Sequence, residues 1–248
     1  MSVLWCQGMF ASGSTWLFNV ALAVSGALEP RLPVRGRFVY GLRDADGLGA
    51  PGLRHVVKAH QAPGGLDQVA ARSDAIIVTL RDPRDAVCSL MQYQGFSFYR
   101  ALFNVRLAAE ACYRLALSPQ AVVLHYERGF VDDPATLDGI ARHLGGAITP
   151  PVRDAIFADH RREAVEARIR GLAALPTAVT GRDGDLYDLA THWHGHHAGR
   201  SGETGRWRRL LYPAQAVGVE TALGDWMACF GYRAEALTRA QEAADMPA

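Results

Sequence analysis

Short apolar runs along the first half of the chain predict the strands of a buried sheet. The clearest run covers residues 75–80, and shorter ones cover 3–7, 54–60 and 121–127. The run at 75–80 is continuous rather than alternating, which is typical of a central parallel strand with both faces covered. We therefore expect these segments to form a mainly parallel sheet.

Segments of helical character lie between and after these runs. We expect helices over residues 16–24, 84–92, 99–117, 133–144, 151–171 and 213–229, the last of them being the final helix of the chain. Strands that alternate with helices predict an α/β fold, a three-layer sandwich with the sheet in the middle. The sequence shows no repeat and no linker, so we expect one domain over residues 1–248.

Three stretches lack such periodicity. Residues 28–54 are rich in Gly, Pro and Arg and are predicted to be mostly loop. Residues 176–206 are polar and Gly-rich, and a loop this long in a compact domain is usually a lid or a binding segment. We expect a mobile lid or substrate loop there, and a frayed end beyond residue 238.

Charge and composition restrict the partners. The formal net charge of +1 gives no support for a nucleic-acid partner, so any anion site must be local. No apolar run reaches the roughly 18–20 residues of a membrane span, and the first residues lack the basic region of a signal peptide. Four cysteines without a CxxC pair are expected to be buried small residues of a cytoplasmic protein, namely Cys6, Cys88, Cys112 and Cys229.

Lysine usage is unusual. The chain has 26 basic residues, and Lys58 is the only lysine among them. A chain that uses arginine everywhere else indicates that arginine would not serve at this position, although survival of one surface lysine by chance is an equal alternative at this point.

The segment from Gly8 to Thr15 follows the first predicted strand and has the spacing of a Walker A loop, except that Ser14 stands in place of the lysine. Backbone N–H groups of such a turn, together with the N-terminus of the next helix, bind phosphate. The fold class is therefore predicted to be P-loop NTPase-like. An ordinary tight turn is the alternative.

Four motifs in order resemble those of the sulfotransferases that use 3'-phosphoadenosine-5'-phosphosulfate (PAPS). Ser12-Gly13-Ser14-Thr15-Trp16-Leu17 resembles the family's 5'-phosphosulfate loop, and Lys58-Ala59-His60 resembles its K-T-H strand end. Residues 81–89 resemble its segment that binds the 3'-phosphate, and residues 200–208 resemble its late R-K-G-x-x-G-D-W-K motif. The matches extend from residue 8 to residue 208.

This resemblance implies catalytic roles for two residues. Lys58 and His60 lie at i and i+2 on a strand, so they point the same way. The resemblance makes His60 the general base that takes the acceptor's proton, and Lys58 the group that stabilises charge on the sulfuryl or bridging oxygen. A strand-end histidine beside a solvated lysine is the alternative.

The resemblance also implies a nucleotide site for PAPS and its product adenosine 3',5'-bisphosphate (PAP). The 5'-phosphosulfate would lie against the loop, with hydroxyl donors from serine and threonine, and Trp16 and Tyr126 would lie near the adenine. Arg81 and Ser89 would hold the 3'-phosphate, and the late loop would close over it. The expected nucleotide-binding residues are Ala11, Ser12, Gly13, Ser14, Thr15, Trp16, Arg81, Ser89, Tyr126, Arg200, Ser201 and Gly202.

Ala11 departs from the family pattern, because the family's loop has lysine or arginine there to contact the leaving phosphate. Lys58 is one candidate to cover this role, and Arg206 or Arg208 is another. The third possibility is a protein that binds the nucleotide and transfers poorly. The late motif is altered too, with Ser201 in place of lysine and Arg206 in place of aspartate.

The histidine-rich stretch 192–197 has no cysteine or carboxylate suitably spaced in the sequence, so we expect a lid or acceptor-binding role there and no metal. The favoured hypothesis is a PAPS-dependent sulfotransferase that acts on a hydroxyl or amine of a small-molecule, carbohydrate or lipid acceptor. The alternatives are a non-catalytic PAP- or PAPS-binding protein and a P-loop nucleotide kinase. The acceptor and the oligomeric state stay open here.

Overall fold

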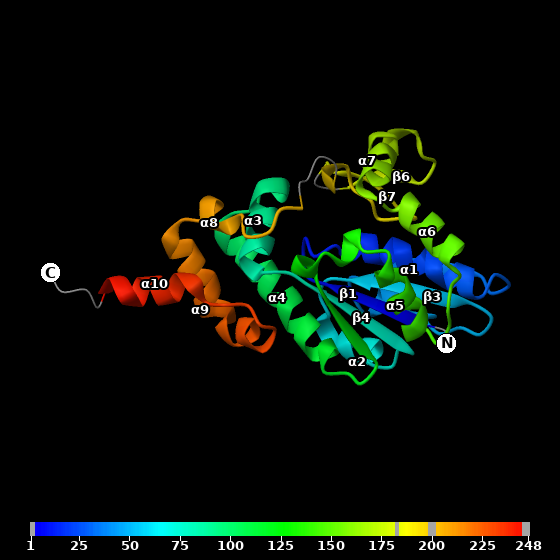
Figure 1. Cartoon of the computed structure of the whole chain (residues 1–248), viewed down its shortest axis with the longest axis horizontal. Helices are drawn as coiled ribbons and strands as arrows, with labels where there is room; N and C mark the ends of the chain where they lie inside the picture. Colours follow the sequence, from blue (N-terminus) through cyan, green and yellow to red (C-terminus); the bar gives the residue numbers. More distant parts are fainter. Residues whose placement is uncertain (1–2, 182–183, 198–201, 245–248) are drawn as a thin grey trace.

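Five parallel strands form the central sheet of the protein (Figure 1), in the order β2-β3-β1-β4-β5. The structure is a computed structural model that describes residues 3–181, 184–197 and 202–244. The strands are β1 (Val3–Gly8), β2 (Val34–Phe38), β3 (Arg54–Ala59), β4 (Ala75–Leu80) and β5 (Ala121–His125). The predicted mainly parallel sheet is confirmed.

Helices cover both faces of this sheet, as a three-layer α/β fold requires. The α-helices are α1 (Ser14–Leu28), α2 (Leu66–Ala70), α3 (Pro83–Gln94), α4 (Phe98–Ala116), α5 (Ala135–His143), α6 (Pro150–Asp159), α7 (Arg162–Arg170), α8 (Trp207–Leu210), α9 (Pro213–Cys229) and α10 (Glu235–Ala244). None of the described helices is long and apolar enough to cross a membrane.

Successive side chains of each strand point to opposite faces of the sheet, so the sheet packs against two separate hydrophobic cores. Ile76 and Val78 of β4 pack with α2, α3, α4 and α9 on one face, whereas Ile77 packs with α1 and α5 on the other. β1 divides in the same way, with Trp5 in the first core and Leu4 in the second. These strands are buried on both sides, which explains why their sequences are mostly apolar rather than alternating.

Residues 28–54 are mostly loop, as predicted, but they also contain β2, which escaped notice because an edge strand tolerates exposed Arg35. Other expectations from the sequence were wrong. The segment 151–171 is broken into α6 and α7. The final helix is α10 rather than α9, and Cys229 is exposed rather than buried.

The segment 176–206 also differs from a plain loop. It contains an antiparallel pair, β6 (Ala178–Thr180) with β7 (Leu186–Asp188), and a 3₁₀ turn at η6 (Gly195–His197). An isolated bridge joins Tyr187 to His194, so the chain folds back on the pair. This arrangement places the histidine-rich stretch at a defined position.

A buried charge cluster fixes α3 against the C-terminal helices. The Arg84 guanidinium donates to Asp82 at 2.7 Å and to Glu220 of α9 at 2.5 Å, and Glu220 is fully buried. Glu220 also accepts from the backbone N–H groups of Ala236 and Leu237 at the start of α10. One carboxylate therefore satisfies a buried cation and caps the final helix.

Replacing Glu220 with alanine is expected to lower the free energy of unfolding by about 3–5 kcal/mol, because a buried cation loses a partner. Urea denaturation followed by circular dichroism measures this change. Glu110→Ala is the matched control, because Glu110 is exposed and its pair with Arg114 should contribute less than about 1 kcal/mol. Equal losses in the two variants would contradict the role assigned to the buried cluster.

Candidate functional site

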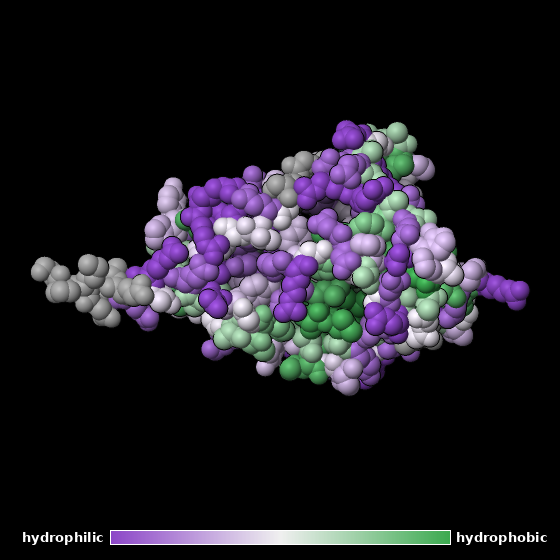
Figure 2. Space-filling model, in the orientation of Figure 1, coloured by the Kyte–Doolittle hydropathy of each residue, from purple (hydrophilic) through white to green (hydrophobic). Residues whose placement is uncertain are grey.

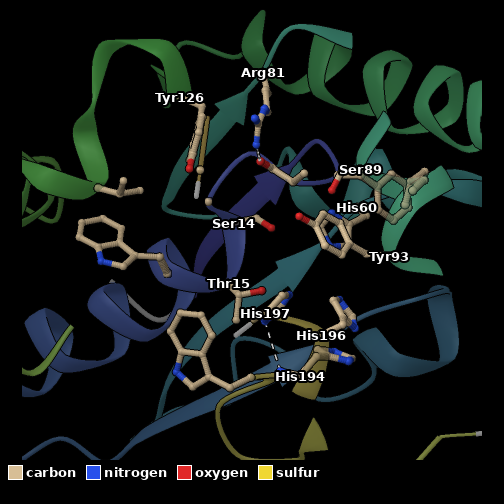
Figure 3. A pocket seen from close by; sticks show the side chains of 18 of the residues that line it. Ser14, Thr15, His60, Arg81, Ser89, Tyr93, Tyr126, His194, His196 and His197 are labelled. Carbon is tan, nitrogen blue, oxygen red and sulfur yellow. Dashed lines mark hydrogen bonds between the residues drawn. The ribbon is translucent and has the colours of Figure 1, made fainter. Parts of the chain in front are cut away.

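A cavity of about 550 Å³ opens where β1, β3 and β4 end (Figure 3). Ligands of open parallel sheets bind at this edge. The described residues that the sequence indicated line this cavity with the exception of Ser12; they are Ala11, Gly13, Ser14, Thr15, Trp16, Lys58, His60, Arg81, Ser89, Tyr126 and Gly202. Arg200 and Ser201 lie outside the described residues.

The loop after β1 has a compact backbone that only certain residues permit. Gly13 has φ +76° and stands at the N-cap of α1, and Ala11 also has positive φ, at +59°. A Cβ on Gly8 would lie 2.3 Å from the Cβ of Ser14, so glycine is required where the strand passes the helix start. The loop therefore brings the N-terminus of a 15-residue helix to the cavity.

Ser12 does not provide the hydroxyl donor that the sequence indicated. Its side chain is fully buried, and its hydroxyl donates to the carbonyl of Met9 and shares a 2.7 Å hydrogen bond with the Thr79 hydroxyl of β4. Ser12 thus holds the loop onto the sheet. Figure 3 shows the hydroxyl oxygens of Ser14, Thr15 and Ser89 toward the middle of the cavity instead.

Lys58 is buried at the end of β3 and reaches the start of α1. Its Nζ donates to the Oγ1 of Thr15 at 2.5 Å and lies 5.3 Å from the centre of the Phe38 ring. Only 2% of the residue is exposed, and this burial lowers the pKa of Lys58 to about 7. The alternative of a solvated surface lysine is therefore wrong.

His60 is held in one orientation beside the same loop. Its Nδ1 lies 2.7 Å from the carbonyl oxygen of Gly8, and its ring stacks on Phe10 at 4.6 Å. A carbonyl only accepts, so Nδ1 carries the ring proton and Nε2 is the basic nitrogen of the neutral ring. Burial, followed by the positive charge of Lys58, lowers the pKa of His60 to about 3, so the ring is neutral at pH 7.

Arg81 connects the loop after β1 to the segment that contains Glu203. Its terminal nitrogens donate to the carbonyls of Ala11, at 2.8 Å, and Glu203, at 2.7 Å. The guanidinium lies 4.5 Å from the centre of the Tyr126 ring, and its Nε is buried without a hydrogen-bond partner among the described residues. The ion pair with Asp85 is long, at 3.9 Å. Arg81 therefore keeps N–H donors that an anion in the cavity can use.

Asp85 binds the backbone of residues 205–207. Its carboxylate accepts from the backbone N–H groups of Gly205 and Trp207, and burial raises its pKa. Gly202 packs so closely that a Cβ there would lie 2.5 Å from the hydroxyl of Tyr126. The late motif thus lies against the residues that follow β4 and β5, although they are far apart in the sequence.

Trp16 lies at the cavity wall and is also anchored in the core. Its indole N–H donates to the carbonyl of His160 at 3.0 Å, and its ring meets Phe130 edge-on. Only 7% of Trp16 is exposed. Trp16 therefore lines the cavity, as the sequence predicted, and also packs in the core.

The structure separates the two arginines considered as replacements for a cation at Ala11. Arg206 lines the cavity, and its guanidinium lies 5.3 Å from the centre of the Tyr93 ring. Arg208 instead pairs with Glu235 of α10 at 2.6 Å. Arg206 therefore stays a candidate for an anion contact, and Arg208 does not.

The charges around the cavity favour an anionic ligand. Among the described lining residues, the basic side chains Lys58, Arg81, Arg162 and Arg206 outnumber the acidic side chains Asp132 and Glu203. Glu203 is moreover paired with Arg209, at 2.5 Å. The positive charge is concentrated at the cavity, as expected of an anion site in a chain whose formal net charge is only +1.

Two further parts of the wall had no residue-by-residue roles from the sequence, although stretch 192–197 was expected to be a lid or acceptor-binding segment. The first is aromatic, formed by Phe10, Phe38, Tyr40, Tyr93 and Phe96. The second is a histidine cluster in which His194, His196 and His197 line the cavity. The view that no carboxylate is near them was wrong, because the turn before β7 brings Asp185 to within 2.7 Å of His194. A Gly-rich turn gives no such signal in the sequence.

No protein-family model and no curated protein matches this chain. Solved structures do. Mouse sulfotransferase SULT7A1 with PAP is 15% identical, with TM-score 0.61, over 91% of this chain and 83% of that one. Retinol dehydratase with androsterone and PAP is 15% identical, with TM-score 0.58, over 91% and 80%. Retinol dehydratase with retinol and PAP is 13% identical, with TM-score 0.57, over 91% of this chain and 81% of that one. The chain therefore has the sulfotransferase fold, as its motifs predicted.

Proposed function

We propose that this protein is a sulfotransferase that takes a sulfuryl group from PAPS and passes it to a hydroxyl or amine of a small-molecule acceptor. The observation that carries this proposal is the convergence of Lys58, Thr15 and His60 beside the loop after β1. These groups meet in a chain with the sulfotransferase fold. Their chemistry suits transfer of an anionic group more than hydrolysis of a metal–nucleoside triphosphate, since Ser14 replaces the Walker lysine.

His60 would act as the general base. Its Nδ1 keeps its proton and donates it to the Gly8 carbonyl, and Nε2 takes the proton from the acceptor's O–H or N–H. At the same time the acceptor atom forms its bond to sulfur, and the bond between sulfur and the bridging phosphate oxygen breaks. The ring starts neutral, because its pKa is near 3 in the free protein. The proton leaves to solvent when the product departs.

Lys58 and the loop would stabilise the charge on the departing phosphate. The Lys58 ammonium and the Thr15 hydroxyl are 2.5 Å apart and border the same space. Backbone N–H groups at the start of α1 add fixed donors. Lys58 thus takes the role that the cation at the Ala11 position has in the family, with Arg206 as a second basic side chain on the wall.

Arg81, Ser89 and Gly202 would form the site for the 3'-phosphate. The guanidinium has five N–H donors, and hydrogen bonds to two carbonyls leave others for a phosphate. Trp16 and Tyr126, whose rings both contact Phe130, supply flat aromatic surfaces in the cavity wall for the adenine. Segment 176–206, of which residues 182–183 and 198–201 are not described, would contribute the lid.

The aromatic wall favours an apolar acceptor. The solved relatives hold androsterone or retinol, small apolar molecules with a hydroxyl. In this chain the rings of Phe10 and Phe38 contact the His60 ring, and Phe96 adds apolar surface to the cavity wall. We therefore propose a hydroxylated or amino-bearing apolar molecule rather than a carbohydrate.

Transfer of a labelled sulfuryl group from PAPS to a panel of sterols, phenols, retinoids, aliphatic amines and sugars tests the proposal. Labelled product is expected with one of the apolar classes and not with sugars. Tight binding of PAP without transfer to any class would instead favour the non-catalytic alternative, which Ala11 motivates.

Binding of PAP at pH 8 is expected to take up a proton. In the free protein Lys58 has a pKa of about 7, so it is mostly neutral at pH 8. A bound anion favours the ammonium and raises this pKa, which requires a proton from the buffer. Calorimetric titrations in two buffers with different ionisation enthalpies measure the uptake. Lys58→Met should abolish it, and unchanged uptake in that variant would contradict the assignment.

A further inference from the structure

The histidine cluster is built around one carboxylate oxygen. The Nδ1 atoms of His194 and His196 lie 2.7 Å and 2.5 Å from the same Oδ2 of Asp185. The three side chains are partly buried, each with 20–25% of its side-chain surface exposed. The two imidazole nitrogens and the carboxylate oxygen all lie within 4.8 Å of one another.

This donor set is that of a transition-metal site. Tetrahedral zinc has bonds of about 2.0–2.2 Å to nitrogen and oxygen, which places its ligand atoms about 3.4 Å apart. The two contacts of the histidine nitrogens with the Asp185 oxygen are shorter, at 2.7 Å and 2.5 Å, as expected when ring N–H groups fill the place of an ion. A bound ion would take over these contacts, and each ring proton would move to Nε2. Only small side-chain shifts separate the two arrangements.

The backbone fixes the positions of these ligands. The β-bridge between Tyr187 and His194 fixes His194 beside β7. The rings of these two residues are also stacked, with their centroids 4.9 Å apart. The Nδ1 of His197 accepts from the backbone N–H of His194 at 3.2 Å, so its proton is on Nε2. His197 therefore offers an N–H donor to the cavity rather than a third imidazole ligand.

The cluster faces the same cavity as the proposed catalytic base. His194, His196 and His60 all line it (Figure 3). Three protein ligands with an open side are typical of catalytic zinc sites, in which water or a substrate atom completes the coordination. A fully enclosed structural site would need a fourth protein ligand.

We propose that Asp185, His194 and His196 bind a divalent transition-metal ion of the Zn²⁺ type in the wall of the cavity. Two imidazoles and one carboxylate favour Zn²⁺ or Co²⁺ over Mg²⁺ or Ca²⁺, which prefer oxygen ligands. The described residues supply three ligands, which leaves a position for an oxygen or nitrogen of the acceptor. This last point rests on the proposed function, whereas metal binding itself does not.

Calorimetric titration of the whole chain, without a polyhistidine tag, with Zn²⁺ tests the site. We expect one ion per chain. His194→Gln, His196→Gln and Asp185→Asn should each weaken binding by at least about 10-fold, the lower limit for loss of even an outer-shell partner. His143→Gln is the matched control, because His143 contacts the Ile76 carbonyl away from the cavity, and its binding should equal that of the wild type.

The Co²⁺ form tests the coordination directly. Its visible absorption should indicate four or five ligands without a thiolate-to-metal band, since the proposed set contains no cysteine and Cys229 is exposed elsewhere. Added azide should shift this spectrum if a position is open. Absence of Zn²⁺ binding by the wild type, or binding that survives in all three ligand variants, would overturn the proposal. Neither result depends on sulfuryl transfer or PAP affinity, so this proposal and the proposed function fail separately.

Discussion

Replacing His60 with glutamine is expected to lower kcat for sulfuryl transfer by at least about 100-fold, the smaller effect typical of losing a general base. Glutamine keeps much of the volume that stacks on Phe10 and can still donate to the Gly8 carbonyl. It lacks the basic nitrogen that takes the acceptor's proton. Steady-state kinetics with PAPS and a saturating acceptor measure the change.

Nucleotide binding separates a catalytic role of His60 from a structural one. The Kd for PAP should stay within about twofold of the wild type, since the base contacts the acceptor and not the nucleotide. His143→Gln is again the control and should leave both kcat and Kd unchanged. Retained turnover in His60→Gln would remove His60 as the base, and a parallel loss of PAP affinity would indicate a damaged loop.

Replacing Lys58 with methionine is expected to lower kcat by about 100–1,000-fold, the range seen when one preorganised donor to a developing negative charge is removed. Methionine fills a similar space at the end of β3, but it offers no N–H to the bridging oxygen. Arg35→Met on the exposed edge strand β2 is the matched control for loss of one positive charge. Equal losses of activity in the two variants would reduce Lys58 to a long-range electrostatic effect.

The same substitution should stabilise the fold. The pKa of Lys58 falls from 10.5 to about 7 on folding, so the folded state disfavours its ammonium form. This cost is greatest below pH 7 and vanishes as the pH rises above 10.5, where the lysine is neutral in both states. Lys58→Met should therefore raise the melting temperature more at pH 6 than at pH 10. A lower melting temperature at pH 6 would contradict this account of the buried lysine.

Much of the fold could be predicted from the sequence because its central strands are covered on both faces. β1 and β4 are mostly apolar, with Gln7 and Thr79 as their polar residues. β2 could not be predicted, since an edge strand carries exposed Arg35 and Gly36, and Gly36 is needed where Phe18 packs against the strand. α10 was missed because Glu220, a distant residue, caps it.

The candidate site, like the fold, could be predicted from the sequence only in part. Lys58 and His60 are recognisable because a strand places i and i+2 on one side and the loop spacing is local. The hydroxyl of Ser12 was misassigned because Thr79, on a neighbouring strand, draws it into the sheet. Asp185 escaped notice because a turn and a β-bridge bring His194 and His196 to its carboxylate, and the sequence shows no periodic pattern that predicts these contacts.

Binding of PAP is the most direct test of the proposed function, because the catalytic and nucleotide-binding roles all depend on a PAPS site beside Lys58 and Arg81. In a thermal-shift measurement, PAP at 100 times its Kd should stabilise the protein by about 2.7 kcal/mol, while Mg²⁺ with ATP or GTP should give little or no shift. Arg81→Ala should remove most of the PAP effect. A clear shift with ATP or GTP and none with PAP would contradict the account and favour a P-loop kinase.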